Sequence, residues 1–358
     1  MGVPGLWTEL ASVGSNTTLA AYAWTAWPRG EDAPGTLLRV GVDATQWVYQ
    51  AQKARGGVNP VLRTLFFRLA RLLALPVHPV FVFDGPHRPP VKRGAAVYTG
   101  PHAITAPFCA FIEHFGFTHW TAPAEAEAEL AWMNRARLVD VVLTDDVDAL
   151  AFGALVVLRP RGRGGAPADE GDQGGASDAT PALPPLRASS PLRASRPPGP
   201  APVPLPPVDD SLPVTLFDTR TTALPLTPDG MVLVAMLSGG DYCVHGVVHC
   251  GIKTAAALAR AGHGATLIDA FRRTHTPSAV LTVDDAWACA MARWRARLGT
   301  ELAENTSGAL GTRMPRLAAS LPGTLWTQDA DRRCLHNYIH PRTSSRDAAL
   351  EALCRQQI

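Results

Sequence analysis

The sequence lacks the long apolar run that a membrane helix requires. No stretch of the 358 residues approaches the roughly 18 to 20 consecutive apolar residues of a membrane span. The amino terminus has no basic segment followed by an apolar one, which argues against a secretory signal. Leu6 stands where an N-myristoylation signal has Ser or Thr. We therefore expect a soluble intracellular protein with no membrane partner.

Cysteine is scarce and lacks metal-binding spacing. The six cysteines form no Cys-x-x-Cys pair; they are Cys109, Cys243, Cys250, Cys289, Cys334 and Cys354. Zinc sites and disulfide frameworks have more regular spacing, so we expect free thiols in a reducing compartment.

A strong net charge is also missing. The 33 basic and 31 acidic residues leave a formal charge of +2. Because the whole chain is not a polycation, any binding of nucleic acid must come from locally clustered charge.

Aromatic residues are absent between Phe152 and Phe217. Pro, Gly, Ala, Ser and Arg dominate this stretch, and the pentamer Pro-Leu-Arg-Ala-Ser occurs at 185–189 and again at 191–195. Such a segment cannot bury enough apolar surface to offset its ordering entropy. We predict a disordered insertion at 160–212 that separates two blocks of the chain.

Strand-like and helix-like segments alternate in the first block. The runs LLRVGVDA and PVFVFDG end in Asp43 and Asp84, and the helix-like PVLRTLFFRLARLLAL separates them. A third strand-like run, VDVVLTDDVDAL, follows a helix with an acidic first turn and ends in Asp146 and Asp148. Strands separated by helices predict an α/β fold with a mostly parallel sheet. The strand-end acids would then meet at one edge, where such sheets bind ligands.

The second block begins with a short strand-like run, VTLFDT, followed by a helix-like segment that ends in Asp241. A Gly-containing turn then leads into a helix that starts near Lys253. The remainder, about 265–358, carries weaker helical signals.

Each acid also has an ordinary structural role open to it. Asp43 and Asp84 could cap a helix or a turn. Glu125 and Glu127 could complement a helix dipole, and we expect Glu129 to do no more than that or to face solvent. Because Glu125 and Glu129 share a helix face, Glu125 can meet Glu127 only from the start of the helix.

Asp146 and Asp148 would point to the same side of an extended segment, although Asp145 beside them also fits a solvated turn. Two carboxylates about 4 Å apart repel by roughly 4 kcal/mol at an effective dielectric of about 20. A cluster therefore needs protonation, hydrogen bonds or a bound cation, and the natural cation is Mg²⁺ or Mn²⁺.

The motifs around these acids resemble one known family in sequence and order. They read MGVPGLW, VGVDA, FVFDGPHRPPVKRG, APAEAEAELA, LTDDVDALAFGA and LSGGDYCVHGVVHCGIKTA. They resemble the XPG/flap-endonuclease family in both blocks. The phrases NPVLRTLFFRLARLLALPVHPVFVFDGP, ARLGTELAENTSGALGTRMPRLAASLP and YIHP look most like the fungal GEN-type Holliday-junction resolvases.

The resemblance implies a PIN-like nuclease core with a helix–two-turn–helix element and a helical carboxy-terminal region. It divides the chain into an XPG N-terminal nuclease region, the insertion, an internal region with the helix–two-turn–helix, and a helical extension. These parts span 1–159, 160–212, 213–265 and 266–358.

Two Mg²⁺ ions, with Mn²⁺ as a substitute, would serve a metal-dependent DNA nuclease of this kind. By resemblance, one ion would be held by Asp43, Asp84, Glu125 and Glu127. The other would be held by Asp146, Asp148 and Asp241, with Glu127 near both. The ions of such a pair lie about 3.5–4 Å apart, where one activates a water and the other stabilises the leaving oxygen.

The resemblance also assigns basic and DNA-binding positions. Lys92 and Arg93 match basic residues at the base of the family's helical arch, although solvated surface charge would explain them equally well. Only residues 94–122 are available for an arch, and they are poor in basic groups.

By resemblance, the helix–two-turn–helix binds the DNA backbone through positions occupied here by Gly246, Gly251, Lys253 and Thr254. In the family a K⁺ ion often bridges this turn and the DNA. The family's Pro-Gly-Val/Ile-Gly turn reads Val-His-Cys-Gly here, which puts the K⁺ site in doubt. For His249 and Cys250 we prefer a packed turn to a metal role.

Gly2, Val3, Leu6 and Trp7 match a segment that lies against the active site and wedges at the DNA branch, but Trp7 could equally serve the core alone. Several arginines could extend the phosphate-binding track or be a solvated helix face: Arg272, Arg273, Arg293, Arg295 and Arg297.

Together these expectations describe a Mg²⁺-dependent nuclear endonuclease that cuts branched or flapped DNA. Its candidate substrates are four-way junctions, where a homodimer would act, and 5′ flaps. One alternative is a 5′-flap or 5′-to-3′ nuclease without resolvase activity. Another is a catalytically silent protein that binds DNA junctions, against which the seven intact acids argue.

Overall fold

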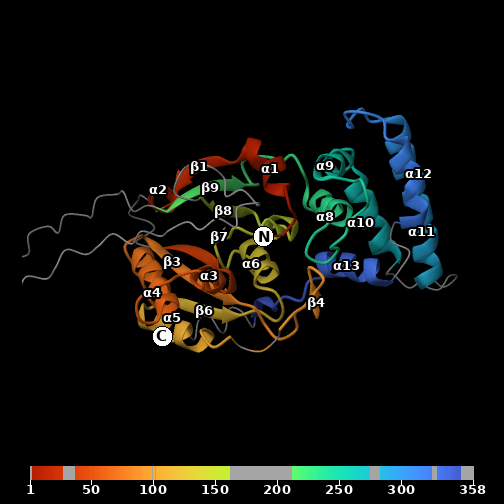
Figure 1. Ribbon diagram of the computed structural model, residues 1–358. Helices are drawn as coiled ribbons and strands as arrows, with labels where there is room; N and C mark the ends of the chain where they lie inside the picture. Colours follow the sequence, from red (N-terminus) through yellow and green to blue (C-terminus); the bar gives the residue numbers. More distant parts are fainter. Residues whose placement is uncertain are drawn as a thin grey trace, which may run out of the picture.

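A seven-stranded sheet forms the centre of the computed structural model, which describes residues 2–26, 37–98, 100, 102–161, 212–274, 283–324 and 329–347 (Figure 1). In spatial order the strands are β1 (Ser15–Thr18), β9 (Pro213–Asp218), β8 (Val156–Pro160), β7 (Val141–Leu143), β2 (Leu38–Asp43), β3 (Val77–Phe83) and β6 (Thr118–Thr121). The five strands from β8 to β6 are parallel, and β9 and β1 pair antiparallel. The predicted mostly parallel α/β fold is confirmed.

The order of strands reverses between β2 and β7. From β2 the chain adds β3 and then β6 on one side, whereas β7 lies on the other side of β2 and is followed by β8. The connections that leave the carboxyl ends of β2 and β7 therefore diverge. Such a reversal opens a crevice at the carboxyl edge of a parallel sheet, which is the usual position of a ligand site.

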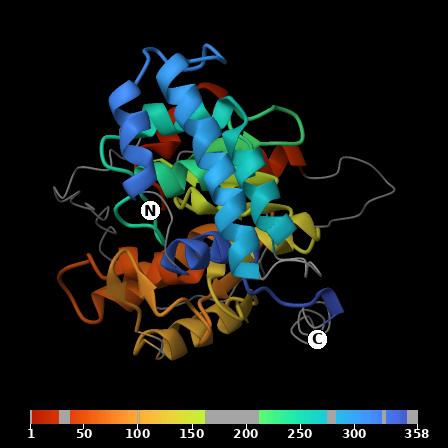
Figure 2. The same cartoon turned by 90° about the vertical axis from the view of Figure 1, so that its right-hand side faces the viewer.

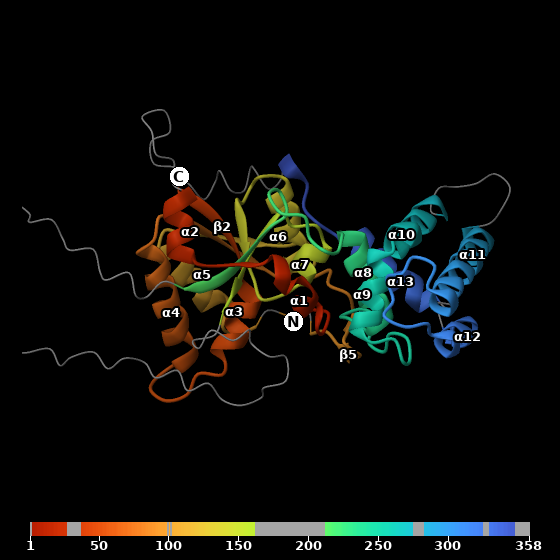
Figure 3. The same cartoon turned by 90° about the horizontal axis from the view of Figure 1, so that it is seen from above.

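Both faces of the sheet are covered because its strands are apolar on both sides. In β3, Val80 and Val82 lie in one core, and Phe81 and Phe83 lie in the other. Figure 3 shows helices on both sides of the sheet. One core takes residues from α2 (Leu19–Ala26), α3 (Ala44–Ala51), α4 (Pro60–Leu73) and α5 (Thr105–His114). The other takes residues from α1 (Leu6–Leu10), α6 (Ala126–Arg135), α7 (Asp148–Ala151) and α8 (Pro228–Ser238). A short 3₁₀ helix, Ala11–Val13, follows α1.

The described carboxy-terminal part is helical, as expected. It contains α9 (Ile252–Arg260), α10 (His263–Thr274), α11 (Val283–Glu304), α12 (Pro315–Thr324) and α13 (Asp329–Ile339). Figures 1 and 2 show α11 and α12 on the outside, beyond α10. The last helix of the described residues, α13, returns to α8 and buries Leu335 and Tyr338 in the core that also contains α8.

The segment expected to supply an arch is built differently. After β3 the chain makes a small hairpin of β4 (Val91–Lys92) and β5 (Ala95–Ala96). The helix that follows, α5, buries Phe108 and Ile112 against the sheet and leads into β6. Most of the described residues in 94–122 thus form an ordinary crossover between two parallel strands, rather than an arch.

The two ends of the predicted insertion lie side by side. Pro160, at the end of β8, pairs with Val214 in β9. The Arg161 N–H donates to the Pro213 carbonyl at 2.8 Å. The residues between them, 162–211, lie outside the described part, so the expected disorder stays a prediction.

The described residues bear on two expectations from composition, which concern membrane-spanning helices and disulfides. In these residues no helix is long and apolar enough to span a bilayer. The cysteines at 109, 243, 250, 289 and 334 are free thiols, as predicted; Cys354 falls outside the described ranges.

Candidate metal centre

Asp43 and Asp84 lie at the carboxyl ends of neighbouring strands and also have structural roles. Asp43 is the last residue of β2 and caps α3, because its Oδ1 accepts from the Gln46 N–H at 2.9 Å. Asp84 follows β3, accepts from the Ala126 N–H at 2.9 Å and pairs with Arg88 at 3.2 Å. Both side chains therefore have the capping role that the sequence left open, and both also lie at the carboxyl edge of the sheet.

Glu125 and Glu127 come from the start of α6. Glu125 is the residue before the helix and has an extended backbone (φ −92°, ψ 137°), as its convergence with Glu127 requires. The Lys92 Nζ donates to Glu125 Oε1 at 2.8 Å and to Glu127 Oε1 at 2.6 Å. One ammonium group thus joins the two carboxylates.

Lys92 and Arg93 reach the acids from the β4–β5 hairpin. Arg93 and Gly94 have φ values of 54° and 73°, which is the left-handed pair of a tight two-residue turn. The Arg93 Nε donates to Asp241 Oδ1 at 2.6 Å. The Lys92 Nζ also forms an ion pair with Asp241 Oδ2 at 3.0 Å. Both predicted basic residues therefore lie in the acidic cluster.

The Asp146–Asp148 segment is not extended, and our expectation for it was wrong. Val147 is already in a helical conformation (φ −71°, ψ −21°), and Asp148 begins α7. The Asp148 N–H donates to Asp146 Oδ1 at 3.1 Å, and the Asp146 N–H donates to Thr144 Oγ1 at 3.0 Å. The turn brings the two carboxylates together by local hydrogen bonding, rather than by strand alternation.

The tightest group of acids combines three separate elements. One ligand oxygen each from Glu127, Asp146 and Asp241 lies within 4.8 Å of the others, and all three residues are buried. Opposite ligands of Mg²⁺ are about 4.2 Å apart, so small side-chain shifts would complete such a shell. A buried carboxylate oxygen without a hydrogen bond is also present, at Asp148 Oδ1. The donor set therefore fits a hard divalent cation.

Crowding alters the pKa of most acids in the crevice. Burial and the charge of Glu127 raise the pKa of Glu125 to about 8 and that of Asp146 to about 7. Burial also raises the pKa of Asp43 and of Asp148 well above the usual range. Asp241 differs: burial raises its pKa, but Lys92 and Arg93 lower it below the ordinary value. Seven carboxyl groups outnumber the three basic side chains that pair with them, Arg88, Lys92 and Arg93, so several of the acids hold a proton more tightly than usual.

Gly2 lies directly against the second group of acids. A side chain at Gly2 would place its Cβ 2.6 Å from Asp148 Oδ1 and closer still to Asp146 Oδ1, and the Gly2 φ is +82°. Only glycine fits both the space and the backbone conformation. The segment that begins with Gly2 therefore lies beside the acidic cluster.

The apolar residues after Gly2 belong to the core. Val3 and Leu6 are fully buried, and Trp7 is 4% exposed. The Trp7 Nε1 donates to the Asp145 carbonyl at 3.0 Å, and the Arg159 guanidinium lies 4.6 Å from its ring. Of the two roles left open for Trp7, the structure supports the core role.

Glu129 is neither solvated nor a simple dipole partner. It is completely buried, and it accepts from the Trp120 Nε1 at 3.0 Å and from the Ser344 N–H at 2.9 Å. The sequence around Glu129 does not indicate this role, because one of its partners, Ser344, lies in a distant segment of the chain. The carboxylate anchors the chain after α13 against α6.

Three contacts in the crevice involve residues that we did not select from the sequence. The Tyr242 hydroxyl donates to Glu125 Oε2, Arg88 pairs with Asp84, and Tyr338 packs against Tyr242 with 4.6 Å between ring centroids. Tyr242 adjoins Asp241, and Arg88 is four residues from Asp84. Their closeness in sequence to the predicted acids could have identified Tyr242 and Arg88, whereas no predicted acid lies near Tyr338 in the sequence.

The predicted DNA-binding turn lies between α8 and α9. Gly246 has a φ of +54° and no room for a side chain against the Leu237 carbonyl, so it is needed for the turn itself. Gly251, at the start of α9, has an ordinary φ of −75° and open space around it. Lys253 is exposed and Thr254 partly so. These residues present a helix amino terminus to solvent.

His249 and Cys250 form part of the same turn. Cys250 is buried, and burial raises its pKa to about 11. His249 is exposed with a φ of +67°. The packed-turn prediction therefore holds for Cys250, while His249 faces outward.

Family models and a solved structure match both the sequence and the fold of this chain. The XPG N-terminal domain matches residues 1–98, and the XPG I-region matches residues 116–241. A crystal structure of the Holliday junction-resolving enzyme GEN1 in complex with product DNA and Mg²⁺ is 31% identical, with a TM-score of 0.66; the alignment covers 99% of this chain and 68% of that one. The chain belongs to the XPG family.

Within the XPG family, a partial sequence match to GEN-type proteins is also present. The mouse (Mus musculus) flap endonuclease GEN homolog 1 is 30% identical over 184 residues, which cover 44% of this chain and 18% of the mouse protein. The human (Homo sapiens) homologue is 33% identical over 144 residues, which cover 34% of this chain and 16% of that protein. The catalytic core of Rad2, at 18% identity and a TM-score of 0.53, shares the fold. This chain thus spans less than a fifth of the mammalian relatives.

Proposed function

We propose that this XPG-family chain is a Mg²⁺-dependent, structure-selective DNA endonuclease that hydrolyses phosphodiesters in branched DNA, with Holliday junctions and 5′ flaps as substrates. The observation that carries the proposal is the convergence of seven carboxylates and two basic side chains at the strand-order reversal. GEN1 structures with product DNA hold Mg²⁺ or Mg²⁺ and Mn²⁺, which supports both the reaction and the metal.

The seven acids are the proposed metal ligands. Asp43, Asp84, Glu125 and Glu127 would hold one ion, and Asp146, Asp148 and Asp241 the other. Bound divalent ions supply an activated water and stabilise the leaving oxygen in phosphodiester hydrolysis. Glu127 is the natural shared ligand, since its oxygen lies near those of Asp146 and Asp241.

The chain's own cations would position the substrate. Lys92 and Arg93 lie on a hairpin beside the acids, so a phosphate entering the crevice meets two positive groups. Gly2, Gly246, Gly251, Lys253 and Thr254 complete the proposed DNA-contacting set. The open space around Gly251 would let a phosphate approach the helix amino terminus closely. A K⁺ ion at this turn is proposed from a GEN-1 structure that binds potassium.

The nucleus is the proposed compartment, and a homodimer on four-way junctions is the proposed resolvase assembly. A 5′-flap nuclease without resolvase activity is the second candidate, because flap endonuclease 1 of Chlamydomonas reinhardtii is 28% identical over 185 residues, 36% of this chain and 46% of that one. A catalytically silent junction-binding protein is the third. The retained acids argue against it.

Cleavage of a 5′ flap and a four-way junction in Mg²⁺ tests the proposal. The Asp146→Asn variant keeps the shape of the side chain but removes its charge, and we expect cleavage of both substrates to fall by at least about 100-fold. Asp269→Asn, on the exposed surface of α10, is the matched control and should cut normally. Equal cutting by the wild type and Asp146→Asn would refute the assignment.

The same assay separates the candidates. Two symmetric nicks in the junction identify a resolvase, and cutting of the flap alone identifies a flap nuclease. A wild-type chain that binds both DNAs without cutting either would identify the silent junction-binding protein.

A further inference from the structure

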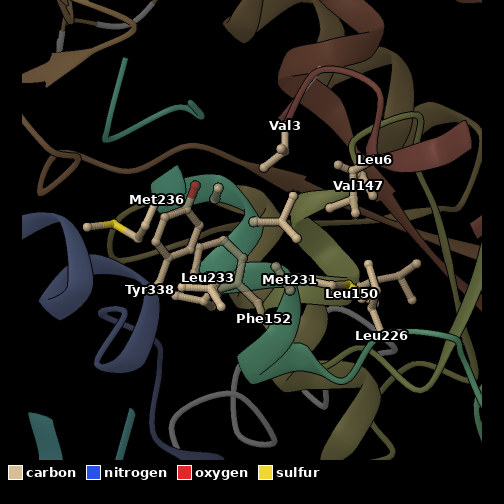
Figure 4. Close-up of a cluster of buried hydrophobic side chains, with 14 of the residues drawn as sticks. Val3, Leu6, Val147, Leu150, Phe152, Leu226, Met231, Leu233, Met236 and Tyr338 are labelled. Atoms are coloured by element: carbon tan, nitrogen blue, oxygen red, sulfur yellow. The ribbon is translucent and has the colours of Figure 1, made fainter. Parts of the chain in front are cut away.

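Tyr338 on α13 has a hydroxyl group with no partner in a buried position. The residue is 4% exposed, and its ring packs against Phe152 and Tyr242, with centroid separations of 5.8 and 4.6 Å. Figure 4 shows the ring beside Phe152, Leu233 and Met236, with the hydroxyl oxygen in red. The hydroxyl makes no hydrogen bond within the described part of the chain. A phenylalanine would fill the same apolar space without burying an unpaired polar atom.

The hydroxyl lies next to Gly240, the residue that precedes the proposed metal ligand Asp241. A Cβ at Gly240, the neighbour of Asp241, would lie 3.1 Å from the Tyr338 oxygen, so the glycine leaves room for it. Phe152, against the ring, is one helical turn from Asp148. Burial, and to a smaller extent the charges of Asp148 and Asp241, raise the pKa of Tyr338 well above its usual value. The phenol is therefore neutral and can donate a proton in a hydrogen bond.

Buried polar atoms without a hydrogen bond occur both in Tyr338 and in a proposed metal ligand. Among the described residues, the Tyr338 hydroxyl and Asp148 Oδ1 are buried side-chain polar atoms without a hydrogen bond, whereas Asp241 Oδ2 is ion-paired with Lys92 at 3.0 Å. Native proteins leave few such atoms, and each needs an explanation. A buried hydroxyl donor next to the residue before Asp241, and an Asp148 oxygen without a hydrogen bond, leave a donor and an acceptor that a bound ion and its ligand shell would use.

We propose that Tyr338 is a positioning residue, whose hydroxyl donates a hydrogen bond to the ligand shell of the cation held by Asp148 and Asp241. This inference rests on the proposed function, because it requires a divalent ion at those acids. Tyr338 would act through the ligands without touching the substrate. Since α13 lies about 100 residues beyond Asp241 in sequence, the carboxy-terminal helices would then help to complete the metal centre.

Tyr338→Phe removes the hydroxyl alone, and electron paramagnetic resonance of free Mn²⁺ measures its effect on the dissociation constant of the metal. We expect the constant to rise about 10-fold for one ion, in line with the loss of an outer hydrogen bond to a metal ligand. In EDTA we expect the thermal midpoint of Tyr338→Phe to equal or exceed that of the wild type, because an unpaired polar atom is removed from the core. Tyr98→Phe, at a tyrosine that is 77% exposed, is the matched control and should change neither value.

A Mn²⁺ dissociation constant within twofold of the wild-type value would overturn the inference. So would a lower thermal midpoint in EDTA, because it would give the hydroxyl a purely structural role. The proposed function fails separately: in that case the wild type itself binds no Mn²⁺ with its acids. A wild type that binds Mn²⁺ and an unaffected Tyr338→Phe variant would overturn only the role of Tyr338.

Discussion

At the residue scale, the raised pKa values of the crevice acids predict how stability depends on pH. The pKa of Asp146 is about 7 and that of Glu125 about 8, against ordinary values of 3.8 and 4.5. The folded chain therefore holds protons that the unfolded chain has lost. Stability from this source is complete below about pH 4 and disappears as pH rises through 7 to 8.

In EDTA we expect the free energy of unfolding to fall between pH 6 and 8.5, by about 1.4 kcal/mol per pH unit for each proton that only the folded state retains. Mg²⁺ should reverse the trend, because binding expels those protons and tightens as pH rises. Urea denaturation at several pH values, with and without Mg²⁺, measures both effects. Asp146→Asn should flatten the slope, and a stability that rises with pH in EDTA would contradict the protonation of these acids.

At the same scale, sequence reasoning identified the acids but missed most of their partners. Asp43 and Asp84 are recognisable because each ends an apolar run. The Glu125–Tyr242 bond joins positions 117 residues apart, and no local pattern encodes it. Glu129 was misjudged for the same reason, since Trp120 and Ser344 remove it from solvent. Side-chain partners depend on tertiary packing, whereas strand ends are local.

At the scale of elements, the amino-terminal segment is fitted to the acidic turn before α7. Gly2→Ala would force a Cβ toward Asp148 Oδ1 and Asp146 Oδ1 and would strain a left-handed backbone. We expect the Asp146–Asp148 turn to shift and cleavage to fall by about 100-fold, since small displacements of catalytic groups cost that much.

Gly56→Ala is the matched control for Gly2→Ala. Its φ of +76° imposes the same backbone strain, but nothing lies within 4 Å of the added atom. Both variants should lose about 1 to 2 kcal/mol of stability from the backbone alone. The comparison uses urea denaturation and flap cleavage, and normal cleavage by Gly2→Ala would show that the contact with the turn is dispensable.

Elements with clear periodicity were predicted well, and short ones were not. The pattern of LLRVGVDA and PVFVFDG gave β2 and β3, and PVLRTLFFRLARLLAL gave α4. The four-residue helix α7 was missed because one turn is too short to show a helical period, so Asp148 seemed part of an extended segment. Similarly, the crossover helix α5 occupies residues that we had considered for an arch.

At the scale of the whole molecule, the two blocks of sequence form one sheet. The first block supplies six of its strands, and β9 from the second block pairs with both β8 and β1. Alternating strands and helices predicted the parallel part. The antiparallel addition of β9 was not predictable, because its partner β8 lies on the other side of the insertion. Asp241 reaches the first-block acids through α8, which packs in the same core as α6.

The geometry of β8 and β9 predicts that the insertion can be removed. Because Pro160 pairs with Val214, the two strands can be joined directly by a short hairpin loop. We propose to replace residues 162–211 with a four-residue loop that contains Asn-Gly at its centre. The sequence predicts that the segment is unstructured, and closing a loop of four rather than about 50 residues costs about 2 kcal/mol less. The shortened chain should be more stable by that amount in urea denaturation and should still cut a 5′ flap. A variant with a Gly-Ser segment of the original length is the control, and a shortened chain less stable than this control would show that the insertion contributes folded contacts.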